Sequence, residues 1–191
     1  MIQEAAVLAI GALLSLATWQ DVKTREIDAW IFAAAAVPAA VLIYLNWHNP
    51  LYLFSLAVGA VLALLTRLLG SGYADSLAIV LISAAPPAAF LPAPFIAVMA
   101  GSLLLPATML WLYLKNSGRP CKMRTLERLT HICVSRDEFM KSPLKFIVGD
   151  VKDVERYDPA KVEVQGWVKA KYGLPYLLYL TVGYWAYVLL S

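Results

Sequence analysis

Residues 51–69 read LYLFSLAVGAVLALLTRLL and contain a single charged side chain, Arg67, near their end. A helix needs about 17–25 apolar residues to cross the hydrocarbon core of a bilayer, and this stretch has that length. A surface helix of a soluble protein would carry a polar face as well. The run therefore predicts a membrane-spanning helix.

The rest of the chain has the same character. Of its 191 residues, 61% are hydrophobic and 15% are charged, against roughly 25% charged residues in an ordinary soluble domain. Five further apolar runs reach or approach the spanning length, so we predict an all-α polytopic membrane protein with six transmembrane helices. The predicted spans are Ile2–Trp19, Ala29–Leu45, Leu51–Leu69, Ser76–Phe90, Ala93–Leu114 and Gly173–Leu190.

The basic residues predict the orientation of these spans. All 16 Lys and Arg residues fall on one side of the membrane, and 13 of them lie between Lys115 and Lys171. The positive-inside rule makes that side cytoplasmic and turns both termini outward in a multi-pass protein of the plasma membrane. We interpret the net charge of +3 as a topology signal that also favours anionic lipid headgroups, and we expect no nucleic-acid partner.

The first run could be mistaken for a secretory signal peptide. It carries Glu4 near its start rather than a basic segment, and no convincing small-x-small cleavage site precedes Asp21. These features are typical of a permanent span.

Most of the charge gathers in one polar stretch. It predicts a small cytoplasmic subdomain of residues 115–172, between a five-helix membrane domain of residues 1–114 and the sixth helix in residues 173–191. Two short runs of the subdomain, 145–148 and 161–167, have the pattern of strands.

The two cysteines of the chain, Cys121 and Cys133, fall in this subdomain. A reducing cytoplasm disfavours disulfides outside hyperthermophiles, so we expect two ordinary buried or interfacial side chains. Together with His131 they are too few and too irregularly spaced for a zinc site. No metal is expected.

Two aspartates stand at the cytoplasmic edges of predicted spans. Asp21 follows the first span, and Asp75 precedes the fourth. Because the first span runs inward and the fourth begins on the inside, the topology places both carboxyl groups at the same depth. Ionisable groups at membrane depth are costly and are therefore candidates for function.

Two close carboxyl groups have a defined chemistry, because like charges a few ångströms apart do not both ionise easily. The ionised group can activate water while the protonated group polarises a peptide carbonyl. The helix dipole favours an anion at a helix start. On that basis we expect Asp75 to act as the base and Asp21 as the acid.

Further candidates flank the aspartates. Gly70 and Gly72 precede Asp75 and form a loop against which an extended substrate can lie, although a flexible interhelical turn is the simpler explanation of the two glycines alone. Glu26 and Asp28 follow the first span and can attract a basic peptide. The alternative for this acidic pair is a solvated loop that balances nearby basic residues.

At these residues the chain resembles the type IV prepilin peptidases, most closely the archaeal branch that processes preflagellin and prepilin. The matching stretches are Asp21-Val-Lys-Thr-Arg-Glu-Ile27 and Gly70-Ser-Gly-Tyr-Ala-Asp-Ser-Leu-Ala78. The resemblance implies an aspartic endopeptidase with Asp21 and Asp75 as the catalytic pair. Its expected partners are prepilin-like or preflagellin-like substrates, whose short basic leaders it removes at the cytoplasmic face. It implies neither cofactor nor metal.

The chain departs from the bacterial pattern of that family in three places. Tyr73 and Ala74 separate Gly72 from Asp75, as in the archaeal variant, and Asp28 stands where bacterial members usually have proline. The four-cysteine zinc element of many bacterial members is missing. We therefore do not carry over their N-methyltransferase activity.

Two other classes of protein fit the same aspartates. A small proton-coupled transporter would use them as proton or cation sites, but it would be expected to carry polar groups near the middle of its spans, and these centres are almost entirely apolar. A noncatalytic membrane assembly scaffold is the other alternative. It should tolerate a neutral isostere at either aspartate.

Overall fold

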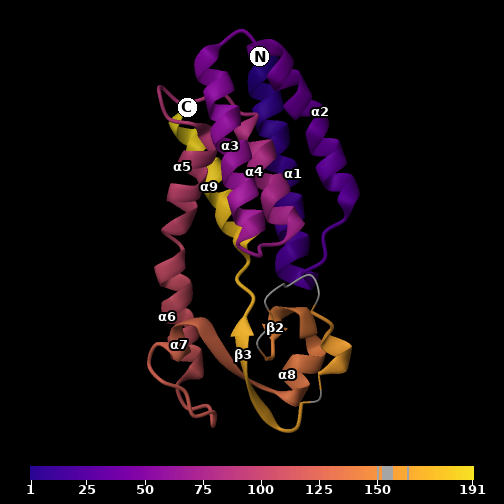
Figure 1. Ribbon diagram of the computed structural model, residues 1–191, viewed down its shortest axis with the longest axis vertical. Coiled ribbons are helices and arrows are strands. Elements are labelled where there is room, and N and C mark those ends of the chain that lie inside the picture. Colours follow the sequence, from indigo (N-terminus) through magenta and orange to yellow (C-terminus); the bar gives the residue numbers. More distant parts are fainter. Residues whose placement is uncertain (150, 152–156, 163) are drawn as a thin grey trace. The chain divides into compact units, whose positions relative to one another are not determined.

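The computed structural model describes residues 1–149, 151, 157–162 and 164–191 (Figure 1). It is mostly helical, at 67%, and divides into two compact units. Unit 1 comprises Met1–Ser102 and Pro175–Ser191, and unit 2 comprises Leu103–Leu174. Four apolar helical stretches have the length and composition to cross a membrane: Ile2–Thr24, Ala29–Asn46, Pro50–Leu68 and Ala93–Asn116.

Unit 1 is a helical bundle. Its helices are α1 (Ile2–Thr24), α2 (Ala29–Asn46), α3 (Pro50–Leu68), α4 (Tyr73–Ser83), α5 (Ala93–Ser102) and α9 (Tyr176–Leu190). Figure 1 shows them running side by side, with both chain termini at one end of the bundle. The end of α1 and the beginnings of α4 and α9 therefore meet at the opposite end.

Two of the predicted spans, the fourth and the sixth, are shorter in the structure than expected. The fourth was predicted to reach Phe90, but α4 ends at Ser83, and the following residues Pro86 and Pro87 lie outside any helix, because proline lacks the backbone donor that a helix needs. The sixth is shorter than predicted, since α9 begins at Tyr176. Among the described residues, four helical stretches reach the spanning length by themselves, so the prediction of six spans is not confirmed.

Helices α5 and α9 approach each other more closely than other side chains would allow. A Cβ atom added to Gly183 would overlap the carbonyl oxygen of Ala97, and one added to Gly101 would overlap that of Tyr179. Small residues allow such contact between helices in membranes, where van der Waals packing replaces the hydrophobic effect as the driving force.

This contact leads to a prediction about stability. Gly183→Ala is expected to destabilise unit 1 by about 1–3 kcal/mol, because backbone atoms must separate to admit the new methyl group. Gly11→Ala is a matched control, since its Cβ would meet the Trp185 ring at 2.9 Å, a side chain that can move. Thermal unfolding in detergent should show a clearly lower midpoint for Gly183→Ala than for Gly11→Ala. Equal midpoints would contradict the prediction.

Polar side chains join α1 to α9 inside the bundle. The hydroxyl groups of Thr18 and Thr181 are 2.7 Å apart, and Thr18 also donates to the carbonyl oxygen of Leu177. Nearby, the indole nitrogen of Trp185 donates to Ser15 at 3.0 Å. These contacts hold α9 along α1, and hence its first residues near the end of α1.

Unit 2 contains a sheet, so the all-α prediction holds for unit 1 alone. Three strands pair antiparallel in the order β1-β3-β2. The elements are α6 (Leu105–Asn116), α7 (Glu127–Thr130), β1 (His131–Ser135), α8 (Arg136–Lys141), a 3-10 turn (Pro143–Lys145), β2 (Phe146–Ile147), a second 3-10 turn (Pro159–Lys161) and β3 (Trp167–Tyr172). The first predicted strand run contains β2. The second overlaps β3 only at Trp167, and its residue 163 lies outside the described residues.

The second unit begins earlier than residue 115, because α6 belongs to its core. Leu112 is fully buried with apolar residues of the sheet. The Asn116 amide donates to the carbonyl oxygen of His131 at 2.7 Å and accepts from the backbone of Cys133 at 2.9 Å. The predicted fifth span, Ala93–Leu114, lies within the spanning stretch Ala93–Asn116, which residues 103–104 divide into α5 and α6.

The expectation of unpaired cysteines was wrong. Cys121 and Cys133 form a disulfide with their Cα atoms 5.7 Å apart. The polar segment after α6 returns alongside β1, which brings the two residues together although 12 positions separate them. Disulfides are unusual in a reducing cytoplasm, and unit 2 is predicted to lie on the cytoplasmic side. The oxidation state of Cys121 and Cys133 in native membranes therefore tests the predicted orientation.

We predict that the chain carries no reactive thiol until it is reduced. After denaturation, a polyethylene-glycol maleimide should add to the unreduced protein at no position and to the reduced protein at two, seen as a double shift on a gel. Cys133→Ser should take one label without reduction and serves as the control. Labelling of unreduced wild type would contradict the pairing.

Candidate functional site

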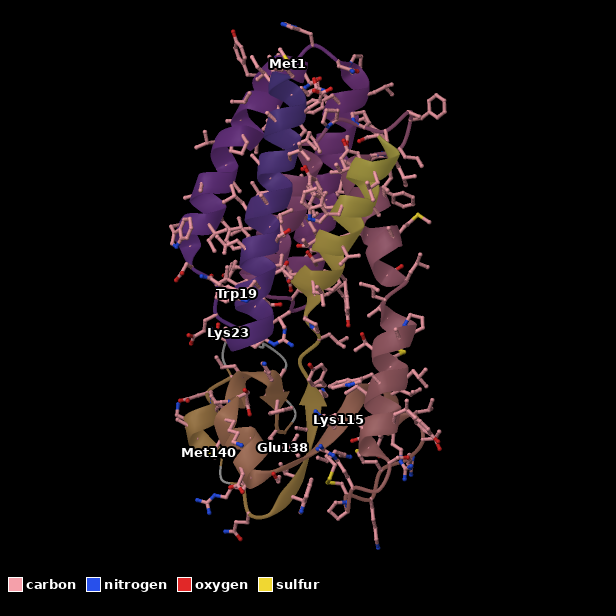
Figure 2. The ribbon with its side chains drawn as sticks, turned by 180° about the vertical axis from the view of Figure 1, so that it is seen from behind. Met1, Trp19, Lys23, Lys115, Glu138 and Met140 are labelled. Atoms are coloured by element: carbon pink, nitrogen blue, oxygen red, sulfur yellow. A yellow bond between two sulfur atoms is a disulfide. The ribbon has the colours of Figure 1, made fainter. Side chains whose placement is uncertain are left out.

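Both predicted catalytic aspartates lie at one end of unit 1. Asp21 is in the last turn of α1, and Asp75 is in the first turn of α4. In Figure 2 the labelled Trp19 and Lys23 mark this end of α1, and Met1 marks the opposite end. Helices α1, α4 and α9 pack against one another, and the Asp75 carboxyl group lies within electrostatic range of Asp21.

Asp21 is held by an arginine one helical turn further on. The guanidinium Nη1 of Arg25 donates to the two carboxylate oxygens of Asp21, at 3.3 Å from Oδ1 and 3.2 Å from Oδ2. The side chains of Arg25 and Asp21 are only 10% and 14% exposed. A nearby cation favours the ionised form of a carboxyl group, and burial strengthens the attraction. The pair therefore favours Asp21 as an anion.

The backbone at Arg25 is unusual. Its φ of +64° is left-handed, a conformation that residues other than glycine adopt infrequently. Its N–H donates to the carbonyl oxygen of Asp21 at 3.0 Å. The backbone of Arg25 thus caps the end of α1, and its side chain bonds to Asp21 in the last turn.

Asp75 has a different environment. It lies before the apolar run of residues 76–90 and outside the four helices of spanning length. Burial, and next the charge of Asp21, raise its pKa from 3.8 to about 7, while the Arg25 charge and the backbone N–H of Gly72 lower it by less. The phenol of Tyr176, the first residue of α9, also lies within electrostatic range of Asp75. Below about pH 7, the Asp75 carboxyl group is therefore mostly protonated.

These environments favour the opposite roles to those expected from the helix dipoles. The dipole argument made Asp75 the anion, but burial and the Asp21 charge outweigh the N–H donor from Gly72. The Arg25 guanidinium, in turn, overcomes the unfavourable dipole at the end of α1. A full charge at about 3 Å outweighs the partial charge of a helix terminus.

The two glycines have separate local roles. Gly70 has a left-handed φ of +86°. Its N–H donates to the carbonyl oxygen of Arg67 at 3.1 Å, and the N–H of Ser71 donates to the carbonyl oxygen of Thr66 at 3.1 Å. These two bonds make a Schellman motif that ends α3. Gly72 precedes α4 and bonds to the carboxyl group of Asp75. Both glycines therefore shape the turn that delivers Asp75 to the end of the bundle.

The two acidic candidates of the first connection differ in their contacts. Glu26 and Asp28 are both exposed. Asp28 accepts from the Gln20 amide at 2.8 Å, and its own N–H donates to Gln20 at 2.9 Å. These two hydrogen bonds give Asp28 a structural role between α1 and α2. The side chain of Glu26 is the better placed of the two for an incoming basic group.

Sequence reasoning offered Arg25 only as one of three possible ion-pair partners of a solvated aspartate, beside Lys23 and Arg67, and assigned no role to Tyr176. The spacing of four between Asp21 and Arg25 is a signal for a helical ion pair and could have been used. Tyr176 has no comparable signal, because only the packing of α9 on α4 brings it to Asp75. Within the part of the chain that the structure describes, no three His, Cys, Asp or Glu residues gather as metal ligands.

Comparison with protein-family models, with curated proteins and with solved structures gave no match to this chain. The interpretation of the site therefore rests on its own geometry and on the motif resemblance.

Proposed function

We propose that the protein is a membrane aspartic endopeptidase that removes short basic leaders from archaellin-like and pilin-like precursors at the cytoplasmic membrane face. The observation that carries the proposal is the pairing of Asp21 and Asp75 from different helices in opposite environments. One carboxyl group is paired with arginine, and the other is buried with a raised pKa. This asymmetry is what a general base and a general acid require at the same pH.

The pair supports a complete hydrolytic cycle. Asp21 takes a proton from water as the water oxygen bonds to the scissile carbonyl carbon, and Asp75 gives its proton to the carbonyl oxygen. The tetrahedral diol then collapses. The proton on Asp21 passes to the leaving nitrogen as the C–N bond breaks, and a hydroxyl proton returns to Asp75 as the product carboxyl group forms.

The location of the pair suits a membrane-tethered substrate. Prepilin-type leaders are short and basic, and a hydrophobic helix follows them. A substrate whose helix lies in the bilayer would present its cleavage site at the membrane border, where α1 ends and α4 begins. The exposed carboxylate of Glu26 adds negative charge beside this border and would favour the basic leader.

The polar groups inside unit 1 bear on the transporter alternative. Thr18 and Thr181 bond to each other and to backbone carbonyl oxygens, and Ser15 bonds to Gly11 and Trp185. Satisfied contacts of this kind are typical of interhelical packing. Groups bonded in this way are less available to coordinate a transported ion, which favours the peptidase.

The proposal is tested by leader removal in cells. The protein is co-expressed with an epitope-tagged prepilin-like substrate, and processing is followed by a gel shift and by mass determination of the new N-terminus. We expect cleavage after the basic leader, and no cleavage when the leader's basic residues are replaced by glutamate. Absence of processing for archaellin-like and pilin-like substrates alike would contradict the proposal.

A further inference from the structure

We propose that Arg25 is a positioning residue of the carboxyl pair: its guanidinium keeps Asp21 ionised, so that the proton shared by the two aspartates resides on Asp75. The inference rests on the proposed function for its catalytic meaning. The location of the proton, however, is a property of the resting protein and can be measured without any substrate.

The first argument is the geometry of the Arg25 side chain. It reaches both oxygens of Asp21 from the same helix, with both groups largely shielded from solvent. Surface ion pairs contribute little because water screens them. This pair is shielded, so its influence on the protonation of Asp21 is correspondingly larger.

The second argument is the left-handed backbone at Arg25. Glycine or asparagine would adopt this conformation more readily, so an arginine here has a conformational cost. The sequence could have ended α1 with a better suited residue. The arginine side chain at this position provides what those residues lack, a cation within reach of Asp21.

The third argument is the set of charged groups around Asp75. Helix α1 contributes Asp21 and Arg25, and α9 contributes the phenol of Tyr176. Arg67 of α3 donates to the carbonyl oxygen of Ser71 and lies over the Tyr73 ring. The sequences of α2 and α5 contain no charged residue. Arg25 is thus a cation that acts on both carboxyl groups of the pair.

This arrangement predicts how removal of the Arg25 charge changes the protonation of the two aspartates. Arg25 lies next to Asp21 and acts more weakly on Asp75, where burial and Asp21 have the larger influence. Removing the cation should therefore make Asp21 compete for the shared proton. An opposite charge near a carboxyl group commonly changes its pKa by about 1–3 units. The proton distribution should change by about tenfold or more.

The test uses dicyclohexylcarbodiimide, which reacts with protonated carboxyl groups in apolar surroundings. The full-length protein in membranes is treated near pH 6, and labelling at Asp21 and Asp75 is quantified by peptide mass spectrometry. Wild type should be labelled at Asp75 and hardly at Asp21. In Arg25→Asn, which suits the left-handed backbone but lacks the charge, the ratio of Asp75 to Asp21 labelling should fall by about tenfold or more.

Two further variants distinguish the effect of the Arg25 charge from a general disturbance of the fold. Arg25→Lys keeps the cation and should retain the wild-type labelling ratio. Lys23→Asn removes a charge from the same helical turn, but Lys23 lies over the Trp19 ring at 4.8 Å, so the ratio should not change. An unchanged ratio in Arg25→Asn, or strong labelling of Asp21 in wild type, would overturn the proposal.

A kinetic readout connects the proton to catalysis. If leader removal is established, Arg25→Asn should lower kcat more than it raises KM and should move both limbs of the pH profile upward, because the carboxyl pair holds its protons more tightly without the cation. Arg25→Lys should restore the profile. Because labelling requires no cleavage, failure of the peptidase proposal and failure of this inference give different results.

Discussion

Asparagine at either Asp21 or Asp75 is expected to abolish leader removal, with a loss of at least about 10³-fold. General acid or base catalysis contributes about 10²–10⁴-fold, and neither amide can replace a carboxyl group that must first gain and then lose a proton. The measurement is the fraction of tagged precursor processed in cells, followed by rates on purified protein. The amount of each peptidase variant in the membrane is compared through an epitope tag on the peptidase itself.

A matched variant exists at the other end of the same helix. Glu4→Gln removes a carboxylate whose ion-pair partner is the exposed N-terminus, at 3.2 Å, and it should process substrate at the wild-type rate. If Asp21→Asn and Asp75→Asn also retain the wild-type rate, the aspartates are not catalytic. A noncatalytic scaffold would then be the better explanation.

The placement of both aspartates at one end of the bundle could be predicted from sequence because it follows from chain direction. An apolar run fixes where a helix meets the membrane border, and alternation of spans places Asp21 and Asp75 at one end. The structure places them at that end of unit 1, within electrostatic range. The number of full-length spans was less predictable. Hydropathy counts apolar residues such as those after Ser83, whether or not they are helical.

The acid and base roles proposed for the two aspartates could not be assigned without the structure. Helix dipoles can be predicted from sequence, but the burial of Asp75 and the contact of Arg25 with Asp21 depend on how the helices pack. The disulfide was missed for a related reason, since residue type and spacing do not show that the chain returns to β1. The sheet of unit 2 pairs β1 with β3 across more than thirty residues, and a single sequence carries little signal for pairing at that range.

The second large effect is expected from pH. Cleavage should be greatest below about pH 7 and should fall about tenfold for each pH unit above it, because Asp75 must be protonated to act as the acid and its pKa is raised to about 7. At low pH, protonation of Asp21 removes the base and lowers the rate again. The profile is measured on purified protein with a fluorescent leader peptide. An alkaline limb that is flat up to pH 9 would contradict the assignment of Asp75 as the acid.

The same carboxyl group should influence stability in a way that needs no substrate. Because the folded protein raises the pKa of Asp75 above its ordinary 3.8, the protonated group stabilises the fold at low pH, and this contribution is lost as pH rises to about 7. Asp75→Asn cannot ionise, so its unfolding midpoint should be close to that of wild type at about pH 3, rise relative to wild type between about pH 4 and pH 7, and exceed it by about 3 °C or more at pH 8. Glu4→Gln, far from the pair, should show no such difference. An Asp75→Asn midpoint below that of wild type at pH 8 would mean that the charged form is stabilised in the bundle, and the assignment of acid and base would then have to be reversed.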